Sequence, residues 1–163
     1  MSAPFHAPPM PVREEWLDYN GHVTDSAYAV LCAAANEAYL EHLGVSADYQ
    51  SRTGCTTYTV EAHLRFLSEV SRGQTVDADV LLVDCDAKRL RLHTTLRVGD
   101  VDVLTGEYLF LHVDQGVGGV APFPPDVAAV LDAERAAHAG VLRPAHLGRG
   151  VVAPVPDPSH PIL

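Results

Sequence analysis

The chain has 163 residues, a length that fits a single domain and should bury about 70% of its unfolded surface on folding. With 47% hydrophobic and 20% charged residues, its composition excludes a wholly disordered chain. Eleven basic against 21 acidic residues give a net charge of −10, which argues against a nucleic-acid-binding role because that role needs a positive surface.

A Pro-rich start and one long helix are predicted for the first third of the chain. We expect residues 1–10 to form an extended arm and Val12–Leu17 to form a first strand. Residues 26–43 carry apolar side chains at three- and four-residue spacing, which predicts a helix with one buried face. That face contains Tyr28, Leu31, Cys32, Ala35, Tyr39 and Leu43. Thr24 or Asp25 is the candidate cap of the helix.

Strand-like runs follow at residues 57–68, 75–84, 87–98 and 101–113. Alternation in the first run predicts one face made of Tyr58, Val60, Ala62, Leu64 and Phe66. Short turns separate the last three runs, which favours an antiparallel meander. A final helix is expected at 126–139, and residues 141–163 are expected to form a Pro-rich C-terminal tail.

This order of elements predicts an α+β fold. Residues 11–140 would form one domain in which an antiparallel sheet wraps around the long Ala-rich helix. Such a sheet leaves an edge exposed, and dimerisation through that edge is a common solution.

The compartment is predicted from features that the sequence lacks. No apolar run reaches the roughly 18 residues of a membrane-spanning helix. The Pro-rich start has neither the basic nor the apolar part of a signal peptide. The cysteines, Cys32, Cys55 and Cys85, are odd in number and widely spaced, which favours free thiols. We therefore expect a cytoplasmic protein without a membrane segment.

The segment before the long helix holds the densest group of chemically active side chains. Residues 16–26, WLDYNGHVTDS, place a carboxylate, an amide and an imidazole before a helix N-terminus. Such a terminus presents unpaired N–H groups and a partial positive charge, which are the parts of an oxyanion site. Asp18 is close enough in sequence to attack or deprotonate a group held there. The alternative is that Asp18, Asn20 and Asp25 only cap the turn and the helix.

The run Asp-Tyr-Asn-Gly-His-Val at 18–23, followed by a helix containing Tyr28, resembles the signature of hot-dog-fold acyl-CoA thioesterases of the 4-hydroxybenzoyl-CoA thioesterase type. The sequence is most similar to the betainyl-CoA thioesterase group of carnitine catabolism, on the runs 58–61, 88–90 and 111–114. The resemblance covers roughly residues 10–125. It implies a hot-dog fold, hydrolysis of a small acyl-CoA with betainyl-CoA favoured, and no cofactor beyond the coenzyme A of the substrate. It also implies a homodimer or a dimer of dimers with sites shared between subunits.

The resemblance also implies roles for residues of the motif. Asp18 matches the carboxylate that acts as nucleophile or general base, and backbone amides around Asp25 would hold the thioester oxygen. Gly21 would let the turn approach the substrate closely, and Asn20 would orient Asp18 or the substrate carbonyl. His22 is expected to be structural or to line the substrate.

A betainyl group carries a trimethylammonium, which aromatic rings and a carboxylate can bind by cation–π and Coulomb attraction. Candidate contacts are Trp16, Tyr19, Tyr58 and Glu61, whereas core packing is the preferred interpretation of Phe66 and Tyr108. Alternation predicts that Glu61 lies on the opposite strand face from Tyr58. For Glu61 a solvated or ion-paired outer face is the alternative.

Coenzyme A carries phosphates, so a chain of net charge −10 needs a local basic strip to bind it. Lys88, Arg89 and Arg91 follow the Asp84-Cys85-Asp86 turn and are the predicted coenzyme A contacts. An ordinary exposed hairpin is the alternative interpretation of this cluster.

Other functional classes find no support in the sequence. There is no GxSxG elbow of an α/β-hydrolase, no GxGxxG dinucleotide loop and no hydratase-type Asp-x-Asn-Pro run. The nine histidines lack metal-ligand spacing, so we predict no metal. The remaining alternative is a non-catalytic acyl-CoA-binding module with the same fold, which would show no turnover that depends on Asp18.

Overall fold

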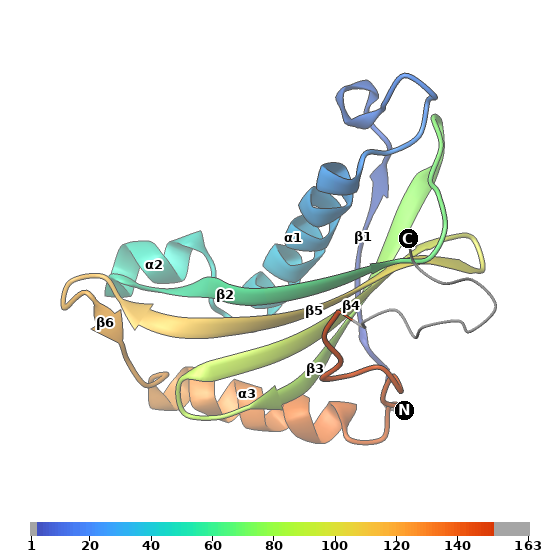
Figure 1. The fold of residues 1–163 in the computed structure, drawn as a ribbon. Helices are drawn as coiled ribbons and strands as arrows, with labels where there is room; N and C mark the ends of the chain where they lie inside the picture. Colours follow the sequence, from blue (N-terminus) through green and yellow to red (C-terminus); the bar gives the residue numbers. More distant parts are fainter. Residues whose placement is uncertain (1–2, 152–163) are drawn as a thin grey trace, which may run out of the picture.

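A curled antiparallel sheet holds helix α1 (Asp25–His42) on one face in the computed structural model, which describes residues 3–151 (Figure 1). The strands are β1 (Phe5–Pro11), β2 (Cys55–Phe66), β3 (Thr75–Cys85), β4 (Arg89–Val98), β5 (Val101–Asp114) and β6 (Gly119–Val120). They lie in the order β1-β3-β4-β5-β2, with β6 paired to β5. The helical elements besides α1 are η1 (Glu14–Trp16), α2 (Ala47–Thr53) and α3 (Pro125–His138). The predicted α+β architecture is confirmed.

Helix α1 supplies the middle of the core. Its predicted buried face is confirmed, since Leu31, Cys32 and Tyr39 are fully buried and Leu43 continues that face. Small alanines let the helix lie close to the sheet, where it contacts β1, β3 and β4. Gly44 follows the helix with a φ of +81°, the left-handed conformation that glycine adopts without strain.

The first strand lies earlier than predicted. Residues 5–11 form β1, which pairs with β3 at one edge of the sheet, whereas part of the predicted strand Val12–Leu17 forms the short η1 turn. Proline cannot donate to a neighbouring strand, so the prolines of β1 are tolerated because the strand lies at an edge. The first ten residues are therefore extended, as expected, but most of them belong to the sheet.

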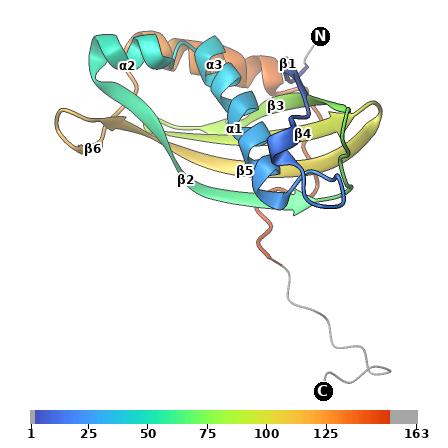
Figure 2. The same ribbon diagram turned by 90° about the horizontal axis from the view of Figure 1, so that it is seen from above.

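Helix α2 was not predicted. The Ser46 hydroxyl accepts a hydrogen bond from Tyr49 N–H at its start, and Gly54 ends it in the left-handed conformation with a φ of +70°. Tyr49 is buried, and its hydroxyl pairs with the His112 ring at 2.8 Å. This short helix thereby covers one end of the sheet (Figure 2).

A bulge in β2 changes the faces predicted for its side chains. The pairing with β5 shifts register between Thr59 and Glu61, so Tyr58 lies opposite Leu111 and Glu61 lies opposite Leu109. Leu109 and Leu111 are two residues apart and lie on one face of β5, the face turned away from α1. Tyr58 and Glu61 therefore share that outer face. The prediction that they lie on opposite faces was wrong because the extra residue reverses the alternation.

The chain after α3 crosses the outer face of the sheet. Helix α3, predicted at 126–139, packs against β3. Beyond it, the His146 ring lies 3.0 Å from that of His93, and Gly148 N–H donates to the Glu107 carboxylate at 2.8 Å. Residues 141–151 of the predicted C-terminal tail thus contact the sheet, and the rest of that tail lies outside the described residues.

Candidate active site

The Asp18 loop (residues 18–23) joins η1 to helix α1. Asp18 N–H donates to His22 O at 2.8 Å, and Gly21 N–H donates back to Asp18 O at 3.0 Å. Gly21 has a φ of +78°, which an L side chain adopts only with strain. Leu17 also pairs with Val23 in an isolated bridge, which brings the start of the loop beside the start of α1.

The Asp18 carboxylate is held by its own loop. Its Oδ1 accepts hydrogen bonds from Asn20 N–H at 2.8 Å and His22 N–H at 3.0 Å. The bond from His22 contributes most to holding the pKa of Asp18 below its ordinary value, and the bond from Asn20 adds to it. Both of these backbone hydrogen bonds go to Oδ1, and the Asn20 side chain adds to the lowering of the pKa. The loop therefore presents an ionised carboxylate whose Oδ1 is held by two backbone N–H groups.

The start of α1 carries the second component expected of the site. Thr24, one of the two predicted cap residues, occupies the cap position, but its side chain makes no capping hydrogen bond. The Asp25 carboxylate instead accepts Ser26 N–H at 2.8 Å. Ala27 and Tyr28 both donate to Thr24 O. Within the described part of the chain, the Asp25 N–H has no partner and lies at the positive end of the helix dipole.

The aromatic side chains around the loop differ in exposure. The Arg13 guanidinium lies 5.1 Å from the centre of the half-buried Trp16 ring, so this face of Trp16 already has a cationic partner. Tyr19 is 97% exposed. The His22 Nδ1 lies 3.6 Å from the carboxylate of the exposed Glu69.

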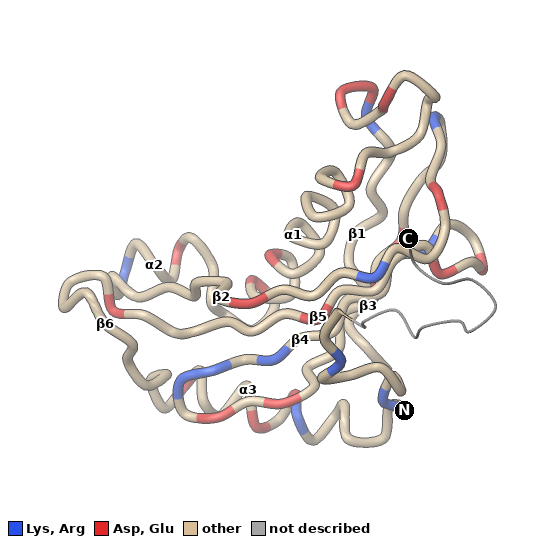
Figure 3. The backbone as a smooth tube through the Cα atoms, viewed as in Figure 1, with Lys and Arg blue, Asp and Glu red and all other residues tan. Residues whose placement is uncertain are grey.

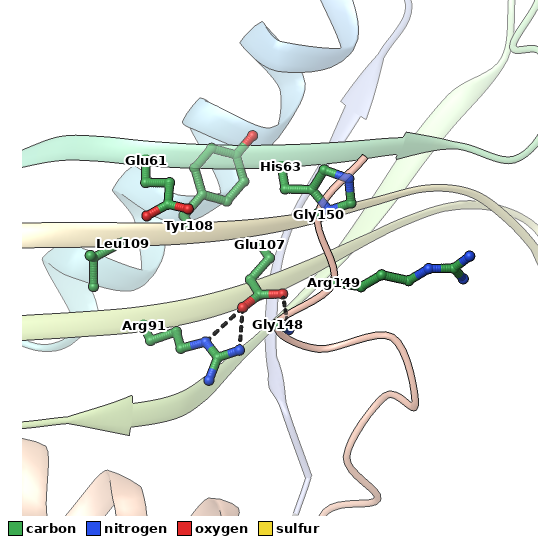
Figure 4. A pocket seen from close by; sticks show the side chains of 9 residues that line it. All are labelled: Glu61, His63, Arg91, Glu107, Tyr108, Leu109, Gly148, Arg149 and Gly150. Carbon is green, nitrogen blue, oxygen red and sulfur yellow. Dashed lines mark hydrogen bonds and ion pairs between the residues drawn. The ribbon is translucent and has the colours of Figure 1, made fainter. Parts of the chain in front are cut away.

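Glu61 and Tyr58 are not brought to Asp18 within one chain. Glu61 lines a cavity of about 280 Å³ on the outer face, with His63, Arg91, Glu107 and the chain at 148–150 (Figure 4). The Tyr58 hydroxyl accepts a hydrogen bond from the Gln115 side chain at 3.0 Å. Asp18, by contrast, belongs to the loop that leads into α1, the helix that packs on the other face of the sheet (Figure 1).

The predicted coenzyme A contacts lie at the β3–β4 hairpin, at the opposite end of the sheet from the Asp18 loop (Figure 3). The Arg89 side chain is paired with Asp86, with 2.7 Å between Arg89 Nε and Asp86 Oδ2. Arg91 is paired with Glu107, with 2.6 Å between Arg91 Nε and Glu107 Oε1. Two of the three predicted basic side chains, Arg89 and Arg91, are thus already paired with carboxylates. The role of all three in binding coenzyme A stays a prediction.

Sequence reasoning missed the segment that supports the loop. Residues 68–72 follow β2, and Val70 O accepts Val23 N–H at 2.8 Å. Arg72 N–H donates to Gly21 O at 3.1 Å, and the Arg72 side chain pairs with Glu14 at 3.1 Å. No motif marks these residues, because most of their contacts with the loop are made by backbone atoms.

Residues 3–151 contain no group of three or more His, Cys, Asp or Glu side chains arranged to hold a metal ion. None of the helices described there is long and apolar enough to cross a membrane.

Comparison with known proteins identifies similar sequences. Residues 12–131 match the family model described as the thioesterase-like superfamily. The L-carnitine dehydrogenase/betainyl-CoA thioesterase of Agrobacterium fabrum is 40% identical over 137 residues, which are 83% of this chain and 28% of that protein. The betainyl-CoA thioesterase of Pseudomonas aeruginosa is 35% identical over 146 residues, which are 88% of this chain and 92% of that protein. The chain therefore spans about 28% of the bifunctional relative and nearly all of the shorter one.

Solved structures share the fold. A putative thioesterase of Pseudomonas putida has a TM-score of 0.81 and 28% identity, covering 93% of this chain and 98% of that chain. A Staphylococcus aureus protein solved in complex with CoA has a TM-score of 0.88 and 24% identity, covering 94% of this chain and 98% of that one.

Proposed function

This chain belongs to the thioesterase-like superfamily, and we propose that it hydrolyses the thioester of a small acyl-CoA to the free acid and coenzyme A, with betainyl-CoA as the favoured substrate. The observation that carries the proposal is the ionised Asp18 carboxylate in the loop that leads into α1, together with the Asp25 N–H at the start of that helix, which has no partner within residues 3–151. The shorter relative, matched over nearly its whole length, is named for this activity and supports the choice of substrate.

The proposed chemistry uses the two components together. Asp18 either attacks the thioester carbon through Oδ2 or removes a proton from a water that does so. In both routes a C–O bond forms, the C–S bond breaks, and the thiolate of coenzyme A leaves and takes up a proton. The carbonyl oxygen becomes negative in between, and the Asp25 N–H and the helix dipole would stabilise that charge.

The rest of the motif would fix this geometry. Asn20 orients Asp18 through its backbone N–H, and Gly21 allows the turn that places that N–H under the carboxylate. His22 adds the second N–H. Its ring would have a structural role or line the substrate. Trp16 and Tyr19 are the aromatic residues of this region that could contact a trimethylammonium.

We propose that the working form is at least a dimer formed through β2. The edge strand β1 contains Pro8, Pro9 and Pro11, which cannot donate hydrogen bonds. Strand β2 has 12 residues and no proline, and within residues 3–151 it pairs only with β5. The exposed Val60 and Leu67 lie along the β2 side. In a single chain, Tyr58 and Glu61 lie on the outer face of the sheet, whereas Asp18 precedes the helix that packs on the inner face. Those side chains, like the basic residues Lys88, Arg89 and Arg91, would therefore serve a site completed by a neighbouring subunit.

No cofactor is needed for this reaction, since coenzyme A is part of the substrate. We further propose that the enzyme works in the cytoplasm, for which the free state of Cys32, Cys55 and Cys85 is the supporting observation.

The function is tested by measuring thiol release from acetyl-CoA, butyryl-CoA, benzoyl-CoA and betainyl-CoA with a chromogenic disulfide reagent. Cys55 and Cys85 are half-buried, so an enzyme-only blank corrects for their own reaction. We expect turnover of betainyl-CoA at the highest kcat/KM. Preference for another acyl group would keep the activity and overturn the favoured substrate. Binding of coenzyme A esters without turnover of any of them would identify a binding module.

A further inference from the structure

The position of the Asp18 loop depends on the 68–72 segment beyond β2. The loop contains neither a helix nor a strand, so its place relative to α1 is fixed by the residues that bond to its backbone. Two of these bonds join it to the 68–72 segment, from Val23 N–H to Val70 O at 2.8 Å and from Arg72 N–H to Gly21 O at 3.1 Å. Whatever holds this segment therefore also holds Asp18.

A tyrosine of α1 reaches the start of that segment. The Tyr28 hydroxyl donates to the Ser68 carbonyl at 3.0 Å, across 40 residues of sequence. Its ring is 4% exposed and packs edge-on against Phe66 at the end of β2, with 5.5 Å between ring centres. Burial raises the pKa of Tyr28, so the hydroxyl keeps the proton that it donates.

The same residue belongs to the first turns of α1. Tyr28 N–H donates to Thr24 O at 3.3 Å, one residue before the Asp25 amide. Tyr28 thus connects the helix start, which supplies the amide, to the segment that holds the loop, which supplies the carboxylate. We propose that Tyr28 is a positioning residue that sets the distance between the Asp18 carboxylate and the start of α1. This inference rests on the proposed function, and it assigns Tyr28 no contact with substrate.

The chain contains a matched control. Tyr39 lies on the same buried face of α1, is fully buried, and also donates its hydroxyl once, to Glu134 Oε2 at 3.2 Å. It lies three turns further along the helix, near α3, where its ring packs against Phe5 and His138 and its hydroxyl is remote in the chain from the Asp18 loop and the 68–72 segment. Removing either hydroxyl deletes one hydrogen bond made by the same helix. Only Tyr28→Phe removes a bond to the 68–72 segment, which holds the Asp18 loop in place.

The test compares Tyr28→Phe and Tyr39→Phe with the wild-type enzyme, using betainyl-CoA turnover, melting temperature and backbone amide hydrogen exchange. A displacement of about 1 Å of a reacting group can lower a rate by ~100-fold, so we expect kcat of Tyr28→Phe to fall at least ~10-fold with little change in KM. Exchange at Val23 and Arg72 should become faster in this variant. Tyr39→Phe should keep the wild-type kcat and the wild-type exchange at those amides.

Two results would overturn the inference: an equal kcat in both variants, or a lower kcat in Tyr28→Phe with unchanged exchange at Val23 and Arg72. If Tyr28→Phe does not fold, Phe66→Leu replaces it, because Phe66 is 53% exposed and yet packs against the Tyr28 ring. We expect the same two changes in that variant, and their absence would count equally against the inference. Asp18→Asn separates this question from the function, since full activity in that variant would refute the proposed role of Asp18 whatever Tyr28 does.

Discussion

Thr94 on β4 donates its hydroxyl to the side-chain oxygen of Asn36 on α1, with 2.6 Å between the two oxygens. Both residues are buried, so this contact is a polar link inside the apolar interface between helix and sheet. The Asn36 Nδ2 is buried without a partner among the described residues. Within residues 3–151, the bond from Thr94 is therefore the one hydrogen bond that the Asn36 side chain makes.

We expect Thr94→Val to destabilise the fold by about 1–3 kcal/mol, because it leaves the Asn36 oxygen buried and unpaired. The neighbouring Thr95 is also buried but lies on the outer face, and its hydroxyl has no partner within residues 3–151. Thr95→Val should therefore change the free energy of unfolding much less. Urea unfolding of the two variants measures this difference, and an equal loss in both would contradict the role given to Asn36.

Gly21→Ala should damage activity more than stability. Its Cβ would meet no atom within 4 Å, but the φ of +78° would be strained by about 1–2 kcal/mol in any L residue. Relieving this strain would shift the turn that holds the Asp18 carboxylate. Gly54→Ala is the control, since Gly54 has a φ of +70° and equally open space but ends α2. Both variants should melt at similar temperatures, with kcat lowered only in Gly21→Ala; equal kcat values would refute the positioning role of this turn.

A charge on the β2 edge should separate the subunits. Val60 is 50% exposed and lies at the bulge of β2, where the proposed dimer would bury it. We expect Val60→Lys to shift the protein from dimer to monomer in light scattering and to lower activity. Val101→Lys places the same charge on a valine that is 56% exposed at the start of β5, and it should remain dimeric. A monomeric wild-type protein would contradict both the interface and the shared site.

Stability should fall as the pH drops below about 6.5, the ordinary pKa of histidine. Burial and the neighbouring His146 lower the pKa of His93 to about 4. In the unfolded chain His93 becomes protonated near pH 6.5, whereas in the folded chain it stays neutral until about pH 4. Protonation therefore favours the unfolded chain, and the free energy of unfolding decreases as the pH falls between those two values. Thermal melts should show a steeper decline in this interval for wild type than for His93→Gln. Parallel curves would show that His93 does not cause the decline.

The elements predicted correctly are those whose signal is local. The buried face of α1 and the strands of the meander follow from periodicity alone. Strand β1 was missed because its prolines argue against a strand except at an edge, and edge position depends on the whole sheet. The bulge in β2 was missed for a related reason, because the alternating sequence continues through the shift in register.

The residues of the candidate site also fall into two groups, those that are adjacent in sequence and those whose positions depend on the topology of the sheet. Asp18, Asn20, Gly21 and the start of α1 are adjacent in sequence, and the structure brings them together. Glu61 and the basic hairpin were grouped with them on chemical grounds, but their distance from Asp18 is set by topology, and one chain does not join them. The hydrogen bonds from residues 68–72 to the loop could not be predicted from the sequence. They are made by backbone carbonyl and amide groups, which nearly every residue carries whatever its side chain.

The central claim is that the Asp18 carboxylate promotes the reaction, and steady-state kinetics of Asp18→Asn and Asp25→Asn with betainyl-CoA test it most directly. Asparagine keeps an oxygen that can accept both loop N–H groups, so the loop should remain in place while the negative charge is lost. We expect kcat to fall by ~100-fold or more in Asp18→Asn. Asp25→Asn, which alters only a side chain bonded to Ser26 N–H, should stay near wild type. Wild-type turnover in a folded Asp18→Asn variant would contradict the account.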